Sequence, residues 1–202
     1  MNVKVYFSGL FIIACCLFAL CSCEKKTTSQ THFTKTDSLT GTYLALQDSM
    51  FQAWNTMIHD DNRKIKAMHN LLHELAASNP EKREELKAYE ERLDHLISLR
   101  YDQKSMSETG IVTEYDFASN SLVTELIALT ESQKEFAYNT ILQKLVDNIR
   151  AADQRVNNYR EEYDFIATQY NRFIEKNRNM LKEIDEDSFL EKKPLFQMLA
   201  EE

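Results

Sequence analysis

Cysteine, glycine and proline are scarce in this chain of 202 residues, and each scarcity excludes a class of structure or site. All of the cysteines lie within the first 23 residues, as Cys15, Cys16, Cys21 and Cys23. Beyond position 23 the sequence therefore offers no disulfide, no thiolate metal site and no cysteine nucleophile. The same region has two glycines and two prolines. Because turns depend on such residues, their rarity disfavours sheets and favours long helices.

Signatures of enzymes and of nucleic-acid binding are also missing. The chain has 24 basic and 32 acidic residues, a net charge of −8, and no concentrated basic stripe, which disfavours nucleic acid as a partner. It has no Gly-x-Ser-x-Gly step and no Gly-rich phosphate loop. A di-iron bundle needs Glu-x-x-His, whereas Glu91 and His95 are spaced Glu-x-x-x-His. We therefore predict a protein that is not an enzyme and has no cofactor.

The longest apolar run lies at the N-terminus. Lys4 precedes an almost unbroken apolar stretch, and Leu20-Cys21-Ser22-Cys23 closes it. A leucine three residues before a cysteine, with a small residue just before that cysteine, is the pattern that lipoprotein signal peptidase recognises in bacteria. The run is too short for a comfortable membrane span. We predict a signal peptide over residues 1–22 and acyl chains such as palmitate on Cys23, which would anchor the protein in the cell envelope. Both the inner and the outer membrane are compatible with this anchor.

The rest of the chain divides by composition. Residues 23–37 are polar and rich in Thr, Ser and Lys, which predicts a flexible tether that starts at the lipidated cysteine. Residues 38–184 carry apolar positions at helical spacing and predict a helical bundle. Residues 185–202 hold a short apolar cluster and predict a tail that packs on the bundle.

The apolar spacing predicts an all-α fold, an elongated antiparallel four-helix bundle with coiled-coil-like packing. The helices are expected at 38–77, 80–108, 112–130 and 136–184, the first and last being the longest. From Ile149 onward, apolar residues recur at alternating spacings of three and four. The last helix is expected to lie along the first and to bring Trp54 near 163–173. Exposed heptads on the last helix would allow a homo-oligomer.

Charged residues interrupt the apolar stripe of the first helix at Asp60–Lys64. We interpret them as a polar layer that sets the register of the bundle by pairing with Arg150 or Arg155 of the last helix. Binding of a partner is the alternative. Under the register interpretation, Asp61→Leu is expected to raise the melting temperature.

Three histidines form the candidate metal site. His69 and His73 are spaced i, i+4, so both can face one ligand from a single helix, and His95 on the following helix can approach them. This set would bind Zn or Ni weakly. The alternative is that the histidines lie on a polar surface and bind nothing.

Aromatic residues concentrate in the first and last helices. They either pack as core or form a ligand or peptide groove between the two helices. The set is Tyr43, Phe51, Trp54, Tyr159, Tyr163, Phe165, Tyr170 and Phe173. Phe51 and Phe165 fall outside the apolar stripes, so we expect them on the surface as contacts for a protein partner.

Short motifs follow one another in a fixed order along the chain. The first helix carries Ala53-Trp54, then Arg63, then Asn70-Leu71-Leu72. The last helix carries Arg155, Tyr159-Arg160, Tyr163 and Tyr170-Asn171, and the tail reads Lys192-Lys193-Pro194-Leu195-Phe196. In order and spacing these motifs resemble the LemA family over most of residues 43–198. This chain resembles a divergent variant, in which a lipid anchor replaces the family's N-terminal transmembrane helix.

The resemblance implies a membrane-tethered helical bundle with no established chemistry and no catalytic residues to carry over. Combined with the anchor at Cys23, it predicts a non-catalytic lipoprotein that presents a helical surface to membrane or periplasmic proteins of the bacterial envelope. The alternative is a helical module that binds a ligand or a metal. The sequence does not identify the partner.

Overall fold

The computed structural model describes residues 34–108, 110–186 and 190–196. Across these ranges it contains four α-helices and no strand, which confirms the all-α prediction. The helices are α2 (Lys35–Ser78), α3 (Arg83–Ser98), α4 (Ile111–Glu131) and α5 (Thr140–Ile184). Single 3-10 turns lie at Pro80–Lys82, Ser105–Ser107 and Lys134–Ala137. The predicted signal peptide, Cys23 and most of the predicted tether fall outside the described residues.

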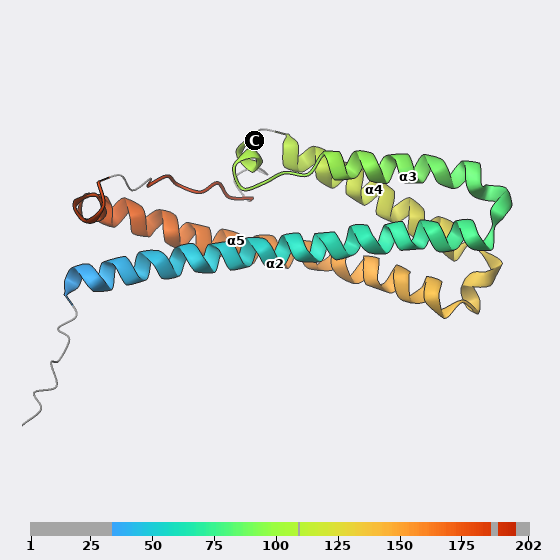
Figure 1. Cartoon of the computed structure of the whole chain (residues 1–202), viewed down its shortest axis with the longest axis horizontal. Coiled ribbons are helices and arrows are strands. Elements are labelled where there is room, and N and C mark those ends of the chain that lie inside the picture. The colour runs from blue at the N-terminus through green and yellow to red at the C-terminus, as the bar shows by residue number, and fades with distance from the viewer. Residues whose placement is uncertain (1–33, 109, 187–189, 197–202) are drawn as a thin grey trace, which may run out of the picture. The chain divides into compact units, whose positions relative to one another are not determined.

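Helices α2 and α5 are the longest, as predicted, with 44 and 45 residues. They run antiparallel along each other (Figure 1), and at about 1.5 Å per residue each is roughly 65 Å long. Aromatic rings mark their register, because the ring centroids of Trp54 and Tyr163 are 5.5 Å apart and those of Tyr43 and Tyr170 are 6.0 Å apart. The predicted placement of Trp54 beside the middle of the last helix is therefore confirmed. No helix in the described ranges is both long and apolar enough to span a membrane.

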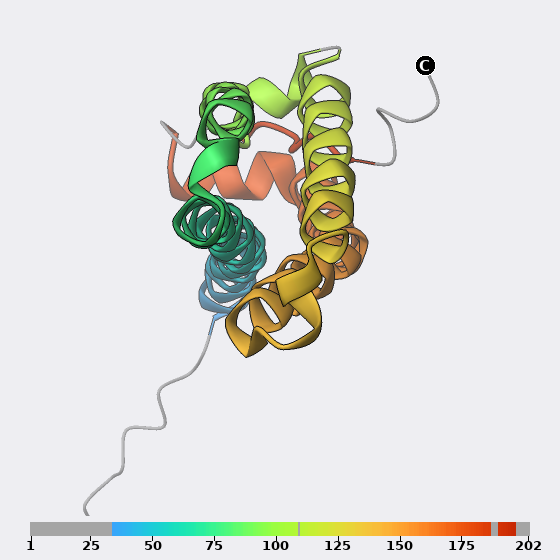
Figure 2. The same cartoon turned by 90° about the vertical axis from the view of Figure 1, so that its right-hand side faces the viewer.

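Helices α3 and α4 are much shorter than the other two, with 16 and 21 residues. They cover the half of the α2/α5 pair that contains the end of α2 and the start of α5 (Figure 1). Seen along the bundle, the four helices surround a shared interior there (Figure 2). In the other half, α2 and α5 continue as a two-helix pair, and the C-terminal segment lies against them.

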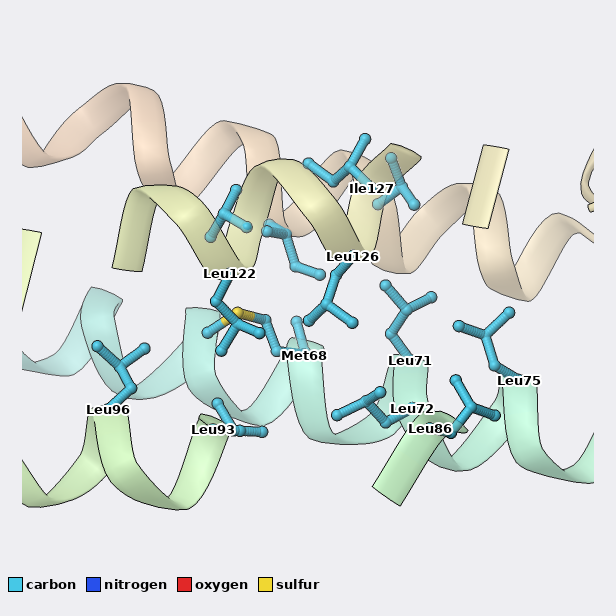
Figure 3. Packing of buried hydrophobic residues seen from close by; sticks show 14 of the residues in the cluster. Met68, Leu71, Leu72, Leu75, Leu86, Leu93, Leu96, Leu122, Leu126 and Ile127 are labelled. Carbon is cyan, nitrogen blue, oxygen red and sulfur yellow. The ribbon is translucent and has the colours of Figure 1, made fainter. Parts of the chain in front are cut away.

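The buried apolar side chains form two clusters, one in each half. The first, here the leucine core, joins α2, α3 and α4 through residues such as Met68, Leu72, Leu96 and Leu126 (Figure 3). Leu142 adds α5 to this cluster. Since burying each large aliphatic side chain is worth about 1.5–3 kcal/mol, this cluster stabilises the four-helix half. The second, here the aromatic core, contains Met50, Trp54, Met57, Met106, Tyr163, Ala167, Tyr170, Ile174, Leu190 and Phe196 among others.

The predicted helix over 80–108 is wrong beyond Ser98, where α3 ends. The chain then turns at Asp102, whose Oδ1 accepts hydrogen bonds from the backbone N–H groups of Lys104 (2.9 Å) and Ser105 (2.7 Å). Such a side-chain turn competes directly with helix. The loop that follows buries Met106 completely. At its end Gly110, with φ of 92°, is the N-cap residue that precedes α4.

Helix α5 begins four residues later than predicted, at Thr140, because Asn139 caps it. The Asn139 side chain accepts hydrogen bonds from the backbone N–H groups of Ile141 (3.0 Å) and Leu142 (3.2 Å). The buried face of α5 begins at Leu142. Ile141 is 57% exposed, whereas its neighbour Leu142 is fully buried.

Candidate functional site

A layer of charged and polar side chains separates the leucine core from the aromatic core. It is built on α2, where Asp60 and Lys64 lie one turn apart in line with the buried Met57 and Met68. Both polar side chains are therefore buried, at 5% and 4% exposure. The polar layer consists of Asp60, Asp61, Lys64, Arg100, Tyr115, Ser119, Asp153 and Arg155.

Asp60 connects α2 to α5 through Arg155. The Arg155 guanidinium donates to both carboxylate oxygens of Asp60, at 2.7 Å and 3.1 Å. This pairing confirms Arg155 as one of the two predicted partners of the charged segment. Arg150, the other, instead donates to Glu131 at the end of α4, at 2.7 Å. The hydrogen bonds that Arg155 donates to the Asp60 carboxylate raise the pKa of the guanidinium, which stays charged.

Asp61 connects α2 to α4 and to the loop after α3. It accepts from the Tyr115 hydroxyl, which lies 2.7 Å from both carboxylate oxygens, and from Arg100 Nη2 at 2.7 Å. Burial raises the pKa of Tyr115 far above its usual value, and the neighbouring charge of Asp61 raises it further. The hydroxyl therefore stays protonated and serves as a hydrogen-bond donor, not as a base.

Lys64 lies at the centre of the polar layer. Its Nζ donates to Ser119 Oγ at 2.8 Å and lies 3.6 Å from Asp61 Oδ1 and 3.7 Å from Asp153 Oδ1. The buried positive charge is thus surrounded by two carboxylates and a hydroxyl from three helices. A buried charge is tolerated only when it is paired and hydrogen-bonded in this way.

A small cavity lies inside the polar layer. Its volume is about 30 Å³, and its polar lining includes Asp60, Asp61, Lys64, Arg100 and Arg160. That is room for one or two water molecules. Pockets that enclose a substrate or a cofactor are usually several hundred Å³ in volume. The geometry is therefore that of a polar layer between helices with a small cavity beside it.

Arg160 lies next to the polar layer and connects it to the aromatic core. Its guanidinium forms two hydrogen bonds to the Asp116 carboxylate, at 2.6 Å and 2.8 Å, and one to the Tyr101 hydroxyl at 3.1 Å. Its Cζ also lies 4.9 Å from the centre of the Phe196 ring. Through Arg160, the polar interior is in direct contact with the C-terminal segment.

The structure places all three predicted metal ligands on the surface. His69 and His73 are exposed on α2, and His95 is exposed on α3. Within residues 34–108, 110–186 and 190–196, no group of three or more His, Cys, Asp or Glu side chains is arranged to hold a metal ion. The geometry thus gives no support to the metal-binding alternative.

The two phenylalanines predicted to be partner contacts are exposed. Phe51 on α2 is 64% exposed, and Phe165 on α5 is 68% exposed. Because Trp54 packs on Tyr163 in the antiparallel pair, Phe51 and Phe165 lie at about the same level along it. Both rings are available to a protein that approaches this part of the bundle.

Sequence reasoning missed the residues that hold the C-terminal segment, namely Asp164, Asn171 and Phe196. Asp164 and Tyr163 are adjacent on α5 and both are buried, so this part of α5 packs on two sides. A periodic stripe marks only one side of a helix. The apolar residues of the tail indicate that it packs on the bundle, but they do not indicate which part of the bundle it contacts.

Comparison with protein-family models, curated proteins and solved structures finds no match for this chain. The likeness to the LemA family therefore stays a prediction that rests on the short motifs quoted above.

Proposed function

We propose that this protein is a lipid-anchored, non-catalytic component of the bacterial cell envelope, similar to LemA proteins, that presents its helical surface to membrane or periplasmic partner proteins. The observation that carries this proposal is the pair of exposed rings, Phe51 and Phe165, level with each other on the two longest helices. Large exposed aromatic side chains are enriched where proteins meet.

The interior of the described bundle supports a non-catalytic role. The charges of the polar layer are paired with each other, and the cavity among them has a volume of about 30 Å³. Burial raises the pKa of Tyr101, and likewise that of Tyr115, so neither hydroxyl supplies a base near neutral pH. These groups hold helices together, which is what a display surface requires.

The proposed anchor agrees with the course of the chain. Helix α2 starts and α5 ends in the same half of the bundle (Figure 1), and the predicted tether joins α2 at Lys35. A lipid on Cys23 would therefore be linked to the bundle through the residues ahead of Lys35. Cys23→Ser should abolish labelling with radioactive palmitate and release the protein from the membrane fraction. Retention of both would refute the anchor.

Site-specific crosslinking tests the display surface. A photoreactive amino acid would replace Phe51 or Phe165 in the full chain, and, as matched controls, Thr56 or Glu162, which are exposed polar positions on the same two helices. Irradiation of intact membranes should give one shared adduct from both phenylalanine positions and none from the controls. Adducts of equal intensity from all four positions, or from none, would contradict the proposal.

A further inference from the structure

The C-terminal segment, residues 190–196, lies extended along α5 in the opposite direction. The Asn171 side-chain amide binds both backbone groups of Lys193. It accepts a hydrogen bond from the Lys193 N–H at 2.7 Å and donates one to the Lys193 carbonyl at 2.8 Å. Asp164 Oδ1 accepts from the Phe196 backbone N–H at 2.9 Å. These three bonds all engage backbone groups, so they would hold another extended segment as readily as this one.

Phe196 inserts its ring into an aromatic pocket and is 8% exposed. The ring stacks on Trp54, with centroids 6.4 Å apart and planes at 9°, and meets Tyr101 and Tyr163 edge-on at 6.2 Å and 5.7 Å. Arg160 covers it in a cation–π contact. The walls of this Phe196 pocket come from α2, from the loop after α3 and from α5. Each wall is held by contacts that do not involve the tail.

Two residues that contact the Phe196 ring each carry a buried polar atom without a hydrogen-bond partner in the described part of the chain. Among the described residues, Tyr163 Oη and Arg160 Nε are buried and have no hydrogen-bond partner. Both belong to side chains in contact with the Phe196 ring, which offers them no acceptor. Unsatisfied buried donors weaken a complex, so a segment that brought a carboxylate, hydroxyl or carbonyl oxygen to them would bind more tightly.

We infer that the groove formed by Asp164, Asn171 and the Phe196 pocket is a binding site for an extended segment of a partner protein, and that the chain's own tail fills it in the absence of that partner. The segment would carry an aromatic anchor residue and, near it, an oxygen acceptor for Tyr163 and Arg160. This inference rests on the proposed function for the existence of a protein partner. It requires neither the lipid anchor nor the exposed Phe51 and Phe165.

A partner protein suits this site better than a second copy of the chain. Five residues separate the end of α5 from Leu190, so the tail is presented to its own groove at an effective concentration on the order of millimolar. The tail of another copy would make the same contacts without this high effective concentration, so it would not displace the chain's own tail from the groove. Displacement therefore requires a segment with better contacts than the tail.

The single tryptophan of the chain reports on the occupant of the groove, because Trp54 forms a wall of the pocket. The test uses the full chain with Phe196→Ala and a synthetic peptide of residues 190–196 as the probe. The variant should keep its helical circular dichroism and show red-shifted Trp54 emission. Added peptide should reverse the shift in a saturable way, and the same peptide with alanine at the anchor should not.

Two matched proteins serve as controls. The wild type and Lys192→Ala, which removes only an exposed ion pair to Glu175, keep the groove filled and should bind the peptide at least tenfold more weakly. If Phe196→Ala lowers the helical signal, Phe196→Leu replaces it, because leucine keeps an apolar side chain in the pocket. Its emission should respond to the peptide in the same direction.

Absence of a Trp54 response to millimolar peptide in both variants would overturn the inference, as would equal binding by wild type and variant. A wild-type dimer formed by exchanged tails, detected by sedimentation, would replace the partner protein with a second copy and overturn that assignment. None of these results affects the crosslinking at Phe51 and Phe165, so failure here can be told apart from failure of the proposed function.

Discussion

Replacing Asp61 by leucine tests the polar layer most directly. Asp61 has a side chain that is 17% exposed and accepts hydrogen bonds from Arg100 and from the buried hydroxyl of Tyr115. Leucine would leave that hydroxyl without an acceptor and would remove one of the two carboxylates that pair with Lys64, leaving the more exposed Asp153. Removing one partner of a buried ion pair costs about 3–5 kcal/mol, while burying the new leucine returns about 1–2 kcal/mol.

We therefore expect Asp61→Leu to lower the free energy of unfolding by about 1–4 kcal/mol. For a domain of this size that corresponds to a melting temperature roughly 2–16 °C lower. The sequence alone predicts the opposite, a higher melting temperature. It shows a charged residue within an apolar stripe but does not show that Arg100, Tyr115 and Lys64 surround that charge. Urea denaturation followed by circular dichroism at 222 nm measures the change.

The matched control is Glu131→Leu, which removes a carboxylate whose partner is the half-exposed Arg150. A surface ion pair contributes about 0–1 kcal/mol, so this variant should stay close to the wild type. Adding Lys64→Met to Asp61→Leu should recover part of the lost stability, since it removes the stranded positive charge. An Asp61→Leu protein as stable as the wild type, or more stable, would refute the reasoning that Asp61 stabilises the fold through its hydrogen bonds and its charge beside Lys64.

Three further substitutions test individual features. Tyr163→Phe removes a buried hydroxyl without a partner and should raise stability at pH 7 by up to about 1 kcal/mol in urea denaturation. Burial, with the nearby charge of Asp164, raises the pKa of Tyr163 to about 12. The unfolded chain therefore loses this proton first, so stability is full below pH 10 and falls as pH rises toward 12. The phenylalanine variant should show a smaller fall when the titration is repeated at pH 9, 10 and 11. Gly110→Ala should cost about 1 kcal/mol, because the backbone there has φ of 92° while no heavy atom crowds the new Cβ; an unchanged denaturation midpoint would contradict this. Met106→Ala should cost about 2–5 kcal/mol, because the side chain is fully buried in the loop before α4; a thermal melt like that of the wild type would show that the loop does not stabilise the fold.

Much of the fold could be predicted from the sequence because a helix repeats its apolar residues at a regular spacing. The stripe through Trp54, Met57, Met68 and Leu72 marks the face of α2 that is buried, and the scarcity of glycine and proline excludes a sheet. The limits of the helices were less predictable. The predicted second helix ends at Ser98, and beyond it Asp102 forms a turn with its own loop, a local competition that no periodicity reports.

The candidate site was only half predictable, for a similar reason. A charged segment inside an apolar stripe signals a polar layer, and the pairing of Asp60 with Arg155 follows from antiparallel register. The roles of Arg100 and Tyr115 do not follow, because both come from segments whose position depends on the loop after α3. The docking of Phe196 depends on contacts between residues more than 140 positions apart, such as that with Trp54, which no local pattern encodes.

Because the helices differ in length, the two halves of the bundle differ in their resistance to a pulling force. Tension applied to the chain ahead of Lys35 acts on the end of the bundle where α2 and α5 lie side by side without α3 and α4. The contacts between α2 and α5 would break one helical turn at a time. This sequential separation would stop at the ion pairs of Asp60 and Asp61. Beyond them all four helices would have to part together. A stretched molecule should therefore lengthen in two stages, a gradual one at low load followed by an abrupt one.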